Sequence, residues 1–249
     1  MRATVVLPTY REAANIGALL RELRAALGPD VELLVVDDDS PDGTAVAAAQ
    51  ADVGARVIVR KGERGLGSAV LRGIREAAAP FVLVMDADGQ HPVEAVARMV
   101  ERAGATSADL VLGSRYASGG GESVFTTRRR AMSRGAAALA RLFLPQVRRL
   151  GVSDPMSGLF LVRKQVLDGI ELRPTGFKIL LEVLGRAPVR SLEEVGYTFQ
   201  PRRNGESKLG TRVMAQYLLQ LARLSGRTYG ARAAGAAAVL GAPFAFWMR

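Results

Sequence analysis

The stretch FVLVMDADGQHP, residues 81–92, decides the class of fold and the place of its site. A short apolar run with β-branched members, closed by a glycine and a proline, predicts a buried strand that runs into a loop. Asp86 and Asp88 follow this run and place two carboxylates at the edge of a core, which is costly unless a cation shares their charge. With Gln90 they offer only oxygen ligands, a set that suits Mg²⁺ or Mn²⁺. The alternative is a solvated acidic turn, or a helix cap ahead of Pro92.

Composition excludes several classes of enzyme. The 249 residues suffice for one large α/β domain or two small ones with an ample core. The chain has no cysteine, which excludes disulfides and thiolate chemistry. Its one histidine, His91, excludes a histidine-rich zinc site. A Ser-His-Asp hydrolase would have to use His91 without any Gly-x-Ser-x-Gly motif.

The charge balance favours a polyanionic partner. Lys and Arg number 34 against 24 Asp and Glu, a net charge of +10. Such a charge fits nucleic acid, an anionic membrane or phosphorylated substrates, and the alternative is a merely solvated surface. Between residues 122 and 154 every charged side chain is an arginine, and three glycines at 119–121 predict a mobile loop leading into this stretch.

The first half of the chain alternates strand-like and helix-like patterns. We expect strands at 3–8, 32–37, 55–60, 81–86 and 109–114, and helices at 15–27, 44–52, 68–78 and 92–103. Asn15 is expected to cap the first helix, and Pro92 to lie in the first turn of the last one. This alternation predicts an α/β fold with a mostly parallel central sheet covered by helices on both faces. Polar residues end the first, second and fourth strands, and ligands bind at that edge of such sheets.

The second half predicts a basic amphipathic helix and an apolar tail. We expect strands at 156–163 and 192–199 and a helix at 177–185. A helix at 211–227 carries apolar residues on one face and arginines off it, so it either packs on its own domain or lies on an anionic membrane. The tail 228–249 is shorter than the roughly 18–20 apolar residues of a membrane span and is either an interfacial anchor or a frayed end. We therefore expect a domain over 1–227, with the basic helix at about 207–227, and no signal peptide.

Several motifs, taken in chain order, resemble glycosyltransferase family 2 and, within it, the polyprenol-phosphate (dolichol-phosphate) mannosyltransferases. They are LPTYRE at 7–12, VDDDSPDGT at 36–44, MDAD at 85–88, GSRY at 113–116, Asp154 with Ser157 and Gly158, GFKILLE at 176–182 and RRNGESK at 202–208. The resemblance extends over residues 3–225. It implies a GT-A-type nucleotide-sugar-binding fold and transfer of mannose from GDP-mannose to a polyprenyl monophosphate. It also implies inversion at the sugar and a peripheral location at the cytoplasmic face of a membrane.

The resemblance also implies residue roles. Guanosine would be held by Pro8, Tyr10, Glu12, Val36 and Asp38. Ribose, diphosphate and metal would be held by Asp86, Ala87 and Asp88, with Gln90 as a further metal ligand. Three positions depart from the family, because Arg11 stands for the usual Asn, Asp39 for a common Gly and Asn204 for a frequent Tyr. The departures put the choice of base in question but leave the reaction class intact.

The expected chemistry is a displacement between two phosphate-bearing substrates. A divalent ion on Asp88 and Gln90 would stabilise the departing diphosphate. The attacking lipid phosphate is already ionised at neutral pH, since its second pKa is about 6, so no general base is needed. His91 is then expected to form a supporting hydrogen bond or to shape the loop and the start of the following helix, with a catalytic base as the alternative. Glu182 is expected either to bond the mannose hydroxyls or to pair with Lys178.

Fixed cations must draw the two anionic substrates together. We expect Arg115, Arg202 and Lys208 to act on the donor and in catalysis, because guanidinium and ammonium groups bind phosphate oxygens. Arg129 and Ser133, four residues apart, are expected to hold the acceptor phosphate, with the neighbouring arginines 128 and 130 as alternatives.

Two other functions remain open from the sequence. The same fold could use UDP-glucose or another sugar nucleotide with the same acceptor. A basic nucleic-acid-binding protein without enzyme activity is the second alternative, but the chain lacks the signature of a nucleic-acid-binding module and aromatics make up only 6% of it. We therefore expect no nucleic-acid partner.

Overall fold

A computed structural model of the chain describes residues 3–106, 108–122, 126–173, 178–203 and 216–226. The first part contains β1 (Ala3–Thr9), α1 (Ala13–Leu27), β2 (Glu32–Asp37), α2 (Thr44–Ala49), β3 (Arg56–Val59), α3 (Leu66–Glu76), β4 (Phe81–Val84), α4 (Val93–Ala105) and β5 (Leu110–Ser114). The second part contains β6 (Gly121–Glu122), α5 (Thr127–Phe143), α6 (Pro145–Arg149), β7 (Phe160–Arg163), a 3₁₀ turn (Lys164–Leu167), α7 (Ile179–Arg186), β8 (Leu192–Gly196) and β9 (Thr198–Phe199). Residues 216–226 are also helical.

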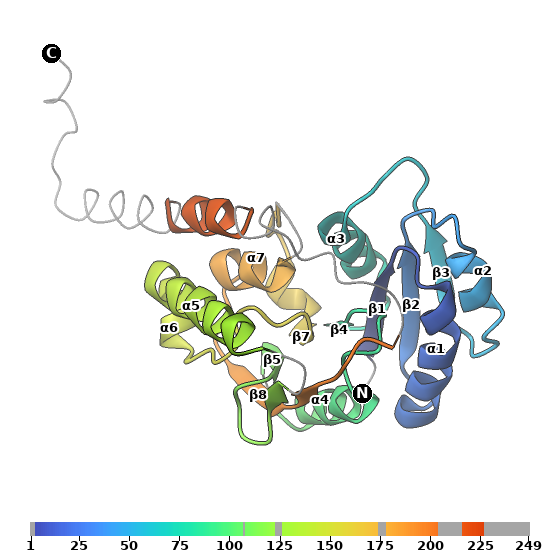
Figure 1. Cartoon of the computed structure of the whole chain (residues 1–249), viewed down its shortest axis with the longest axis horizontal. Helices are drawn as coiled ribbons and strands as arrows, with labels where there is room; N and C mark the ends of the chain where they lie inside the picture. Colours follow the sequence, from blue (N-terminus) through green and yellow to red (C-terminus); the bar gives the residue numbers. More distant parts are fainter. Residues whose placement is uncertain (1–2, 107, 123–125, 174–177, 204–215, 227–249) are drawn as a thin grey trace, which may run out of the picture.

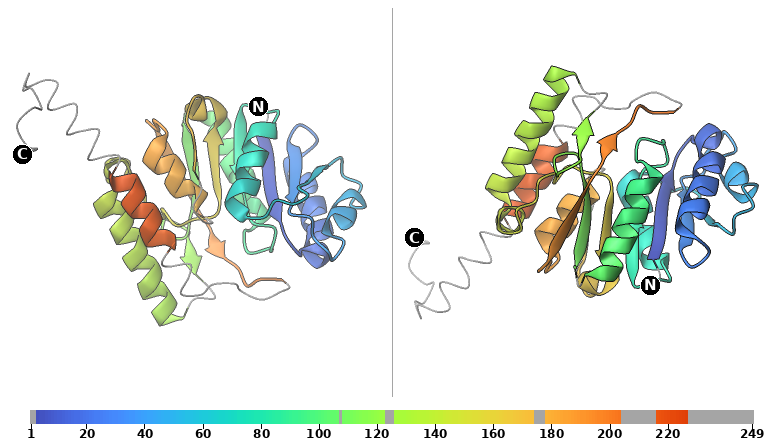
Figure 2. Two further views of the ribbon diagram at one scale, coloured as in Figure 1. Left: turned by 90° about the horizontal axis from the view of Figure 1, so that it is seen from above. Right: turned by 90° about the horizontal axis from the view of Figure 1, so that it is seen from below.

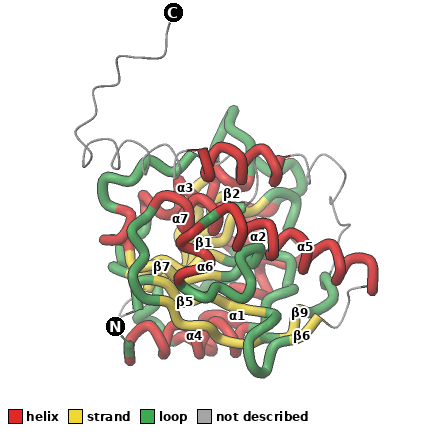
Figure 3. Tube along the Cα trace, turned by 90° about the vertical axis from the view of Figure 1, so that its left-hand side faces the viewer, coloured by secondary structure: helices red, strands yellow, loops and turns green. Residues whose placement is uncertain are grey.

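A mostly parallel sheet forms the centre of the fold, as predicted. Its strand order is β3-β2-β1-β4-β7-β5-β8, and only β7 runs antiparallel to its neighbours β4 and β5. The short strands β6 and β9 pair in a second sheet away from the main one (Figure 3). Every residue of β1 is buried, which is typical of a central parallel strand covered on both faces.

Helices cover both faces of the sheet (Figures 1 and 2). On β1, Val5 and Leu7 point to the face packed by α1, α2 and α4, while Val6 points to the other face. That other face is packed by α3, α5, α6, α7 and the helix 216–226. Alternate residues of one strand therefore serve two separate cores, which confirms the expected three-layer arrangement.

Some predicted element boundaries were wrong. Helix α1 begins at Ala13, so Asn15 is not its cap, and its side-chain amide donates to Glu12 Oε2 at 2.7 Å instead. Pro92 precedes α4 rather than lying in its first turn. The strand expected from 156 begins only at Phe160, because the Ser157 hydroxyl bonds the backbone of Leu159 in a local turn.

The remaining differences lie in the second half of the chain. The strand expected over 192–199 is two strands, since the chain leaves β5 after Gly196 and continues beside β6. Helices α5 and α6 had no clear sequence signal, because the buried face of α5 consists largely of small residues such as Ala136, Ala137 and Ala140 rather than a leucine stripe.

The helix 216–226 packs on its own domain beside α7 and α5 (Figure 1), which confirms that alternative for the described residues. Tyr217, Leu221 and Leu224 are buried there, and the Tyr217 hydroxyl donates to the Ala136 carbonyl. In the part of the chain that the structure describes, no helix is both long and apolar enough to cross a bilayer.

Candidate active site

The carboxyl ends of β1, β2 and β4 open into a cavity of about 490 Å³. It brings together most of the residues that the sequence singled out: Pro8, Tyr10, Glu12, Asp38, Asp86, Ala87, Asp88, Gln90, Arg115 and Arg202. The loop after β5, the start of α7 and the end of β9 complete its wall. The predicted convergence of polar strand ends at one edge of the sheet is therefore present in the fold.

Among the described residues, Val36 and Ser133 do not line this cavity, and two further predicted side chains lie outside the described part of the chain. Val36 is fully buried in β2 and packs in the hydrophobic core. The Ser133 hydroxyl lies on α5 and accepts a hydrogen bond from the Tyr116 hydroxyl at 2.9 Å. Lys208 and the side chain of Arg129 lie outside the described residues.

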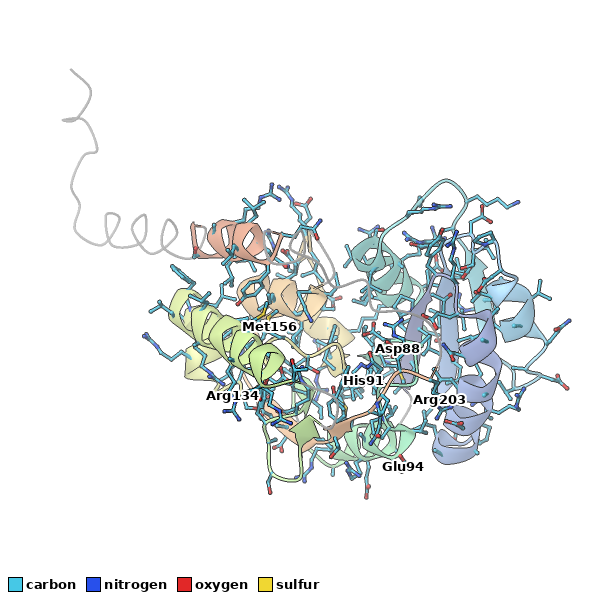
Figure 4. All side chains as sticks on the ribbon, in the orientation of Figure 1. Asp88, His91, Glu94, Arg134, Met156 and Arg203 are labelled. Carbon is cyan, nitrogen blue, oxygen red and sulfur yellow. The ribbon has the colours of Figure 1, made fainter. Side chains whose placement is uncertain are left out.

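Asp86 and Asp88 lie in different environments within the cavity. Asp88 is buried; its Oδ1 accepts from the Gln90 backbone N–H at 3.0 Å, and its Oδ2 forms an ion pair with Arg202 at 2.8 Å. The Asp86 side chain is 44% exposed, and its Oδ2 lies 3.7 Å from His91 Nε2. Figure 4 shows Asp88 and His91 close together between the two halves of the fold.

These environments push the two carboxyl pKa values apart. Burial raises the pKa of Asp88, and the negative charge of Asp86 raises it further, despite Arg202. Although the Asp86 side chain is partly exposed, desolvation by the walls of the cavity raises its pKa too, but His91, Lys178 and Arg202 more than offset this and hold that pKa below its ordinary value. Of the two, Asp88 is therefore the carboxylate whose negative charge the surrounding protein stabilises less well.

The residues present fit a divalent metal ion. Among the described residues no three His, Asp or Glu side chains group together as a complete metal site. Two aspartates and the Gln90 amide nevertheless supply hard oxygen donors, and Mg²⁺ typically takes one or two carboxylates and then substrate phosphates. Burial and the neighbouring carboxylate of Asp86 raise the pKa of Asp88, and a bound cation would favour the charged form of this carboxyl.

His91 packs behind the carboxylates. Its side chain is 1% exposed, and its ring lies 5.4 Å from the Tyr197 ring and 5.6 Å from the Phe199 ring. Within the described structure neither ring nitrogen has a hydrogen-bond partner, and the 3.7 Å separation from Asp86 is too long for one. A role in shaping the wall behind Asp86 fits this placement better than abstraction of a substrate proton.

Two cations that the sequence did not indicate contact residues of the cavity: Arg64 lines it beside Tyr10, and Arg60, outside its lining, pairs with Asp38. Arg60 is 2% exposed in its side chain and donates through Nε to Asp38 Oδ1 at 2.8 Å, while the Gly65 N–H donates to Asp38 Oδ2 at 2.7 Å. The guanidinium of Arg64 lies 5.0 Å from the centre of the Tyr10 ring. Arg60 comes after a stretch with an ordinary strand pattern, and nothing near it in the sequence predicts its ion pair with Asp38, 22 positions away.

Arg115 lines the cavity but is held by a partner. Its Nε and one terminal nitrogen donate to the two oxygens of buried Asp154 at 2.7 and 2.8 Å. Burial lowers the pKa of Arg115, but the Asp154 carboxylate more than offsets this and raises it above its ordinary value. The guanidinium is therefore permanently charged and oriented by a fork-to-fork contact.

Lys178 is a further cavity residue that sequence reasoning placed only as a partner for Glu182. Its ammonium donates to the Met156 carbonyl at 2.7 Å. Both expectations for Glu182 were wrong, since it does not line the cavity and does not pair with Lys178. Its buried carboxylate instead accepts from Arg186 at 2.5 Å, from Gln220 at 3.2 Å and from the Arg173 N–H at 3.1 Å.

Gln220 connects this buried network to the cavity wall. Its amide also donates to the Lys178 carbonyl at 3.0 Å. The helix 216–226 is thus fastened to the start of α7, the helix whose first residues line the site. GFKILLE contained the signal for Lys178, but Gln220 is recognisable only in the fold.

Several known proteins are similar in sequence to this chain over most of its length. Residues 4–170 match the family model "Glycosyl transferase family 2". The chain is 41% identical over 227 residues to a dolichol-phosphate mannosyltransferase of Pyrococcus furiosus, with 90% of this chain and 64% of that protein covered. It is 38% identical over 244 residues to that of Saccharomyces cerevisiae (92% and 88% covered). It is 33% identical over 246 residues to an undecaprenyl-phosphate mannosyltransferase of Micrococcus luteus (94% and 98% covered).

A solved structure confirms the type of fold. Glucosyl-3-phosphoglycerate synthase from Mycobacterium tuberculosis, in complex with Mn²⁺, UDP-glucose and phosphoglyceric acid, superposes with a TM-score of 0.71 at 21% identity, covering 90% of this chain and 80% of that one. The GT-A-type fold is therefore confirmed. The chain spans 64% of the length of the Pyrococcus protein, so the activity of that whole protein is not assigned to this chain on identity alone.

Proposed function

The chain belongs to glycosyltransferase family 2, in the branch of the dolichol-phosphate mannosyltransferases, and from this premise we propose that it transfers mannose from GDP-mannose to a polyprenyl monophosphate with inversion. One observation carries the proposal. A single cavity at the carboxyl ends of the strands joins an aspartate pair to the cationic side chains of Arg202, Lys178 and Arg115. Such a cavity suits a nucleoside diphosphate with a sugar attached.

The donor would be held along the cavity from Asp38 to Asp88. Asp38 is oriented by Arg60 and Gly65, and Tyr10 offers its ring beside Arg64, which suits the nucleoside end. Asp86, Asp88 and Gln90 would hold Mg²⁺ or Mn²⁺, and when bound this ion would act as a Lewis acid on the leaving diphosphate.

Arg202 lies where its guanidinium could shift from Asp88 to the phosphates of the donor. Its guanidinium contacts Asp88 at 2.8 Å and lies 3.9 Å from Glu12. A metal ion on Asp88 would weaken the first contact, and the donor phosphates would then attract the released guanidinium. Lys178, fixed by the Met156 carbonyl, supplies a second cation at the start of α7.

The acceptor would attack through a phosphate oxygen from the side of α5. A phosphate monoester is mostly ionised at neutral pH, with a second pKa of about 6, so a single displacement with inversion needs no base from the chain. Arg115 would draw the acceptor phosphate, because Asp154 holds its guanidinium at the wall of the cavity that faces α5. Arg129 and Ser133 are the further residues that we propose for the acceptor phosphate, and Lys208 is the further residue that we propose for the donor.

A membrane surface is the proposed source of the acceptor, at its cytoplasmic face. Among the described residues, most of the large exposed apolar side chains lie on α5 and the helix 216–226: Met132, Leu142, Phe143, Leu218 and Leu219. Exposed apolar residues beside arginines are typical of helices that lie on anionic membranes. We propose that residues 1–227 form the catalytic domain and that the tail 228–249, outside the described residues, adds to this peripheral attachment.

The test is transfer of labelled mannose to a short polyprenyl phosphate by the full chain. Lipid product is expected from GDP-mannose with Mg²⁺ or Mn²⁺ and not with a chelator. Asp88→Asn is expected to lower kcat about a hundredfold or more, because a group that stabilises the leaving charge is removed. The matched control is Asp168→Asn, an exposed aspartate outside the cavity, which is expected to retain full activity.

Three results would contradict the proposal. They are lipid product that forms equally in the chelator, a preference for UDP-glucose over GDP-mannose, and full activity of Asp88→Asn. The second result would move the assignment to the same fold with a different donor. Steeply salt-dependent binding of RNA without binding of a sugar nucleotide would instead support a nucleic-acid-binding function.

A further inference from the structure

The segment 200–203, which follows β9, runs beside the loop 88–90 that carries two of the proposed metal ligands. The Gln200 N–H donates to the Gln90 carbonyl at 3.0 Å, and the Arg203 N–H donates to the Asp88 carbonyl at 3.2 Å. The Gln90 side-chain amide donates back to the Gln200 carbonyl at 3.1 Å, across 110 positions of the chain. This bond uses the amide nitrogen, so the amide oxygen stays available to a metal ion. The segment and the loop are therefore joined as one unit at the wall of the donor cavity.

The side chain of Arg203 extends from this segment over Gly89 to α1. A Cβ on Gly89 would lie 2.7 Å from both Cγ and Cδ of Arg203, so the aliphatic part of that side chain lies against the backbone between Asp88 and Gln90. Its two terminal nitrogens donate to the two carboxylate oxygens of Glu22 on α1, each at 2.7 Å. Figure 4 shows Arg203 on the side of Asp88 that faces α1. A single side chain thus connects the metal loop to a helix of the central fold.

The Glu22–Arg203 ion pair has a favourable geometry for a pair at the surface. Both side chains are 42% exposed, and most exposed pairs contribute little to stability. Here two parallel hydrogen bonds join a planar guanidinium to a carboxylate, which fixes the orientation of both groups. The hydrogen bonds from Arg203 hold the pKa of Glu22 below its usual range, so both groups are charged at neutral pH. Within the described residues Glu94 attracts the same guanidinium only at longer range.

The position of Arg202 depends on this ion pair, because Arg202 directly precedes Arg203. Its own guanidinium contacts Asp88 at 2.8 Å. With the backbone held on one side by Gln200 and on the other by Arg203, the Arg202 side chain can change partner while its point of attachment stays in place. Groups that are held in place before a ligand arrives lose less entropy when they bind it.

We propose that Glu22 and Arg203 are positioning residues for the donor site. Their ion pair would hold the segment 200–203 against the loop 88–90 and so fix the groups that meet a metal-bound nucleoside diphosphate. Neither side chain lines the donor cavity, the one at the carboxyl ends of β1, β2 and β4, so both act through their neighbours. The inference rests on the proposed function, since it concerns the donor of that reaction.

The first test measures amide hydrogen exchange of the segment 200–203 in the full chain, without any substrate. The N–H groups of Gln200 and Arg203 donate to the loop 88–90, so their exchange reports how often the two stretches separate. Glu22→Arg places a second cation against Arg203 and should speed this exchange about fivefold, the upper end of what an exposed ion pair contributes. Glu76→Arg is the matched control, because Glu76 forms an exposed ion pair on α3 away from the cavity and the substitution changes the net charge equally.

The second test titrates the same variants with GDP and Mn²⁺ by calorimetry. Glu22→Arg should raise the Kd for GDP about fivefold relative to Glu76→Arg, because the groups that bind the diphosphate are no longer held in place. The two variants should unfold at the same urea concentration, which separates positioning from a general loss of stability. Combining Glu22→Arg with Arg203→Glu exchanges the two charges and should recover part of both losses.

The outcomes distinguish this inference from the proposed function. The inference is overturned if Glu22→Arg matches Glu76→Arg in hydrogen exchange or in GDP affinity, or if the exchanged pair behaves like Glu22→Arg alone. If the unaltered chain neither binds GDP nor transfers mannose, the proposed function fails, and hydrogen exchange alone decides whether the ion pair holds the segment. Should Glu22→Arg not fold, Arg203→Gln takes its place, with Arg72→Gln, on the surface of α3, as its control.

Discussion

Replacing Asp154 by asparagine should destabilise the protein severely, because it leaves the guanidinium of Arg115 without an anion. Asp154 is fully buried and Arg115 is 8% exposed, and two bonds of 2.7 and 2.8 Å join them. Asparagine keeps the shape of the side chain but loses the negative charge. Removing one partner of a buried ion pair costs about 3–5 kcal/mol, a large fraction of the roughly 5–15 kcal/mol that stabilises a domain.

The assay is urea unfolding at neutral pH, followed by circular dichroism, with the free energy of unfolding extrapolated to zero urea. Glu76→Gln is the matched control, since Glu76 contacts Arg56 and Arg72 at 3.4 and 3.0 Å on the surface. An exposed pair of this kind contributes less than about 1 kcal/mol.

A double variant separates loss of charge from loss of packing. Arg115→Met with Asp154→Leu removes both charges and fills the space with apolar groups, which should recover most of the lost stability. It should not recover transfer activity, because the cation at the wall of the donor cavity is gone. The reasoning is refuted if Asp154→Asn unfolds within about 1 kcal/mol of the unaltered chain, or if the double variant is as unstable as the single one.

Three further predictions concern stability, each measured by the same urea titration. Asp39 has a φ of 53°, so Asp39→Gly should stabilise by about 0.5–1 kcal/mol, and a destabilised variant would show that its side chain has a role. Gly73→Ala would place a Cβ 2.2 Å from a methyl carbon of Val6 and should destabilise by about 1–3 kcal/mol, whereas Gly135→Ala, with open space around it, should stabilise by up to about 1 kcal/mol. Equal effects of the two alanines would contradict the close packing of α3 on β1. Burial raises the pKa of Glu32, but hydroxyl, amide and guanidinium donors more than offset this effect and hold the pKa below 4.5. Glu32 therefore stabilises the fold above that pH, and this contribution is lost as the pH falls further. Glu32→Gln should therefore lower stability at neutral pH and flatten its decline below about pH 5, and an unchanged acid slope would count against it.

Local patterns in the chain were sufficient for the sheet and its acidic edge. The apolar run before Asp86 and the polar residues after β1 and β2 predicted a parallel sheet with a site at its carboxyl edge, and the structure has both. These features depend on neighbours two to four positions apart, so burial and helical or strand periodicity are visible in a short window. The motifs also identified the family, which the comparisons confirm.

The partners of the charged residues were decided only by the tertiary structure. Arg60 binds Asp38 across 22 positions, Arg115 binds Asp154 across 39, and Glu182 accepts from Gln220 across 38. In a chain with many arginines, any acid can pair with several of them, and the choice follows from strand order and helix packing. Pairing over long separations depends on which elements become neighbours in space, and periodicity along the chain does not record that.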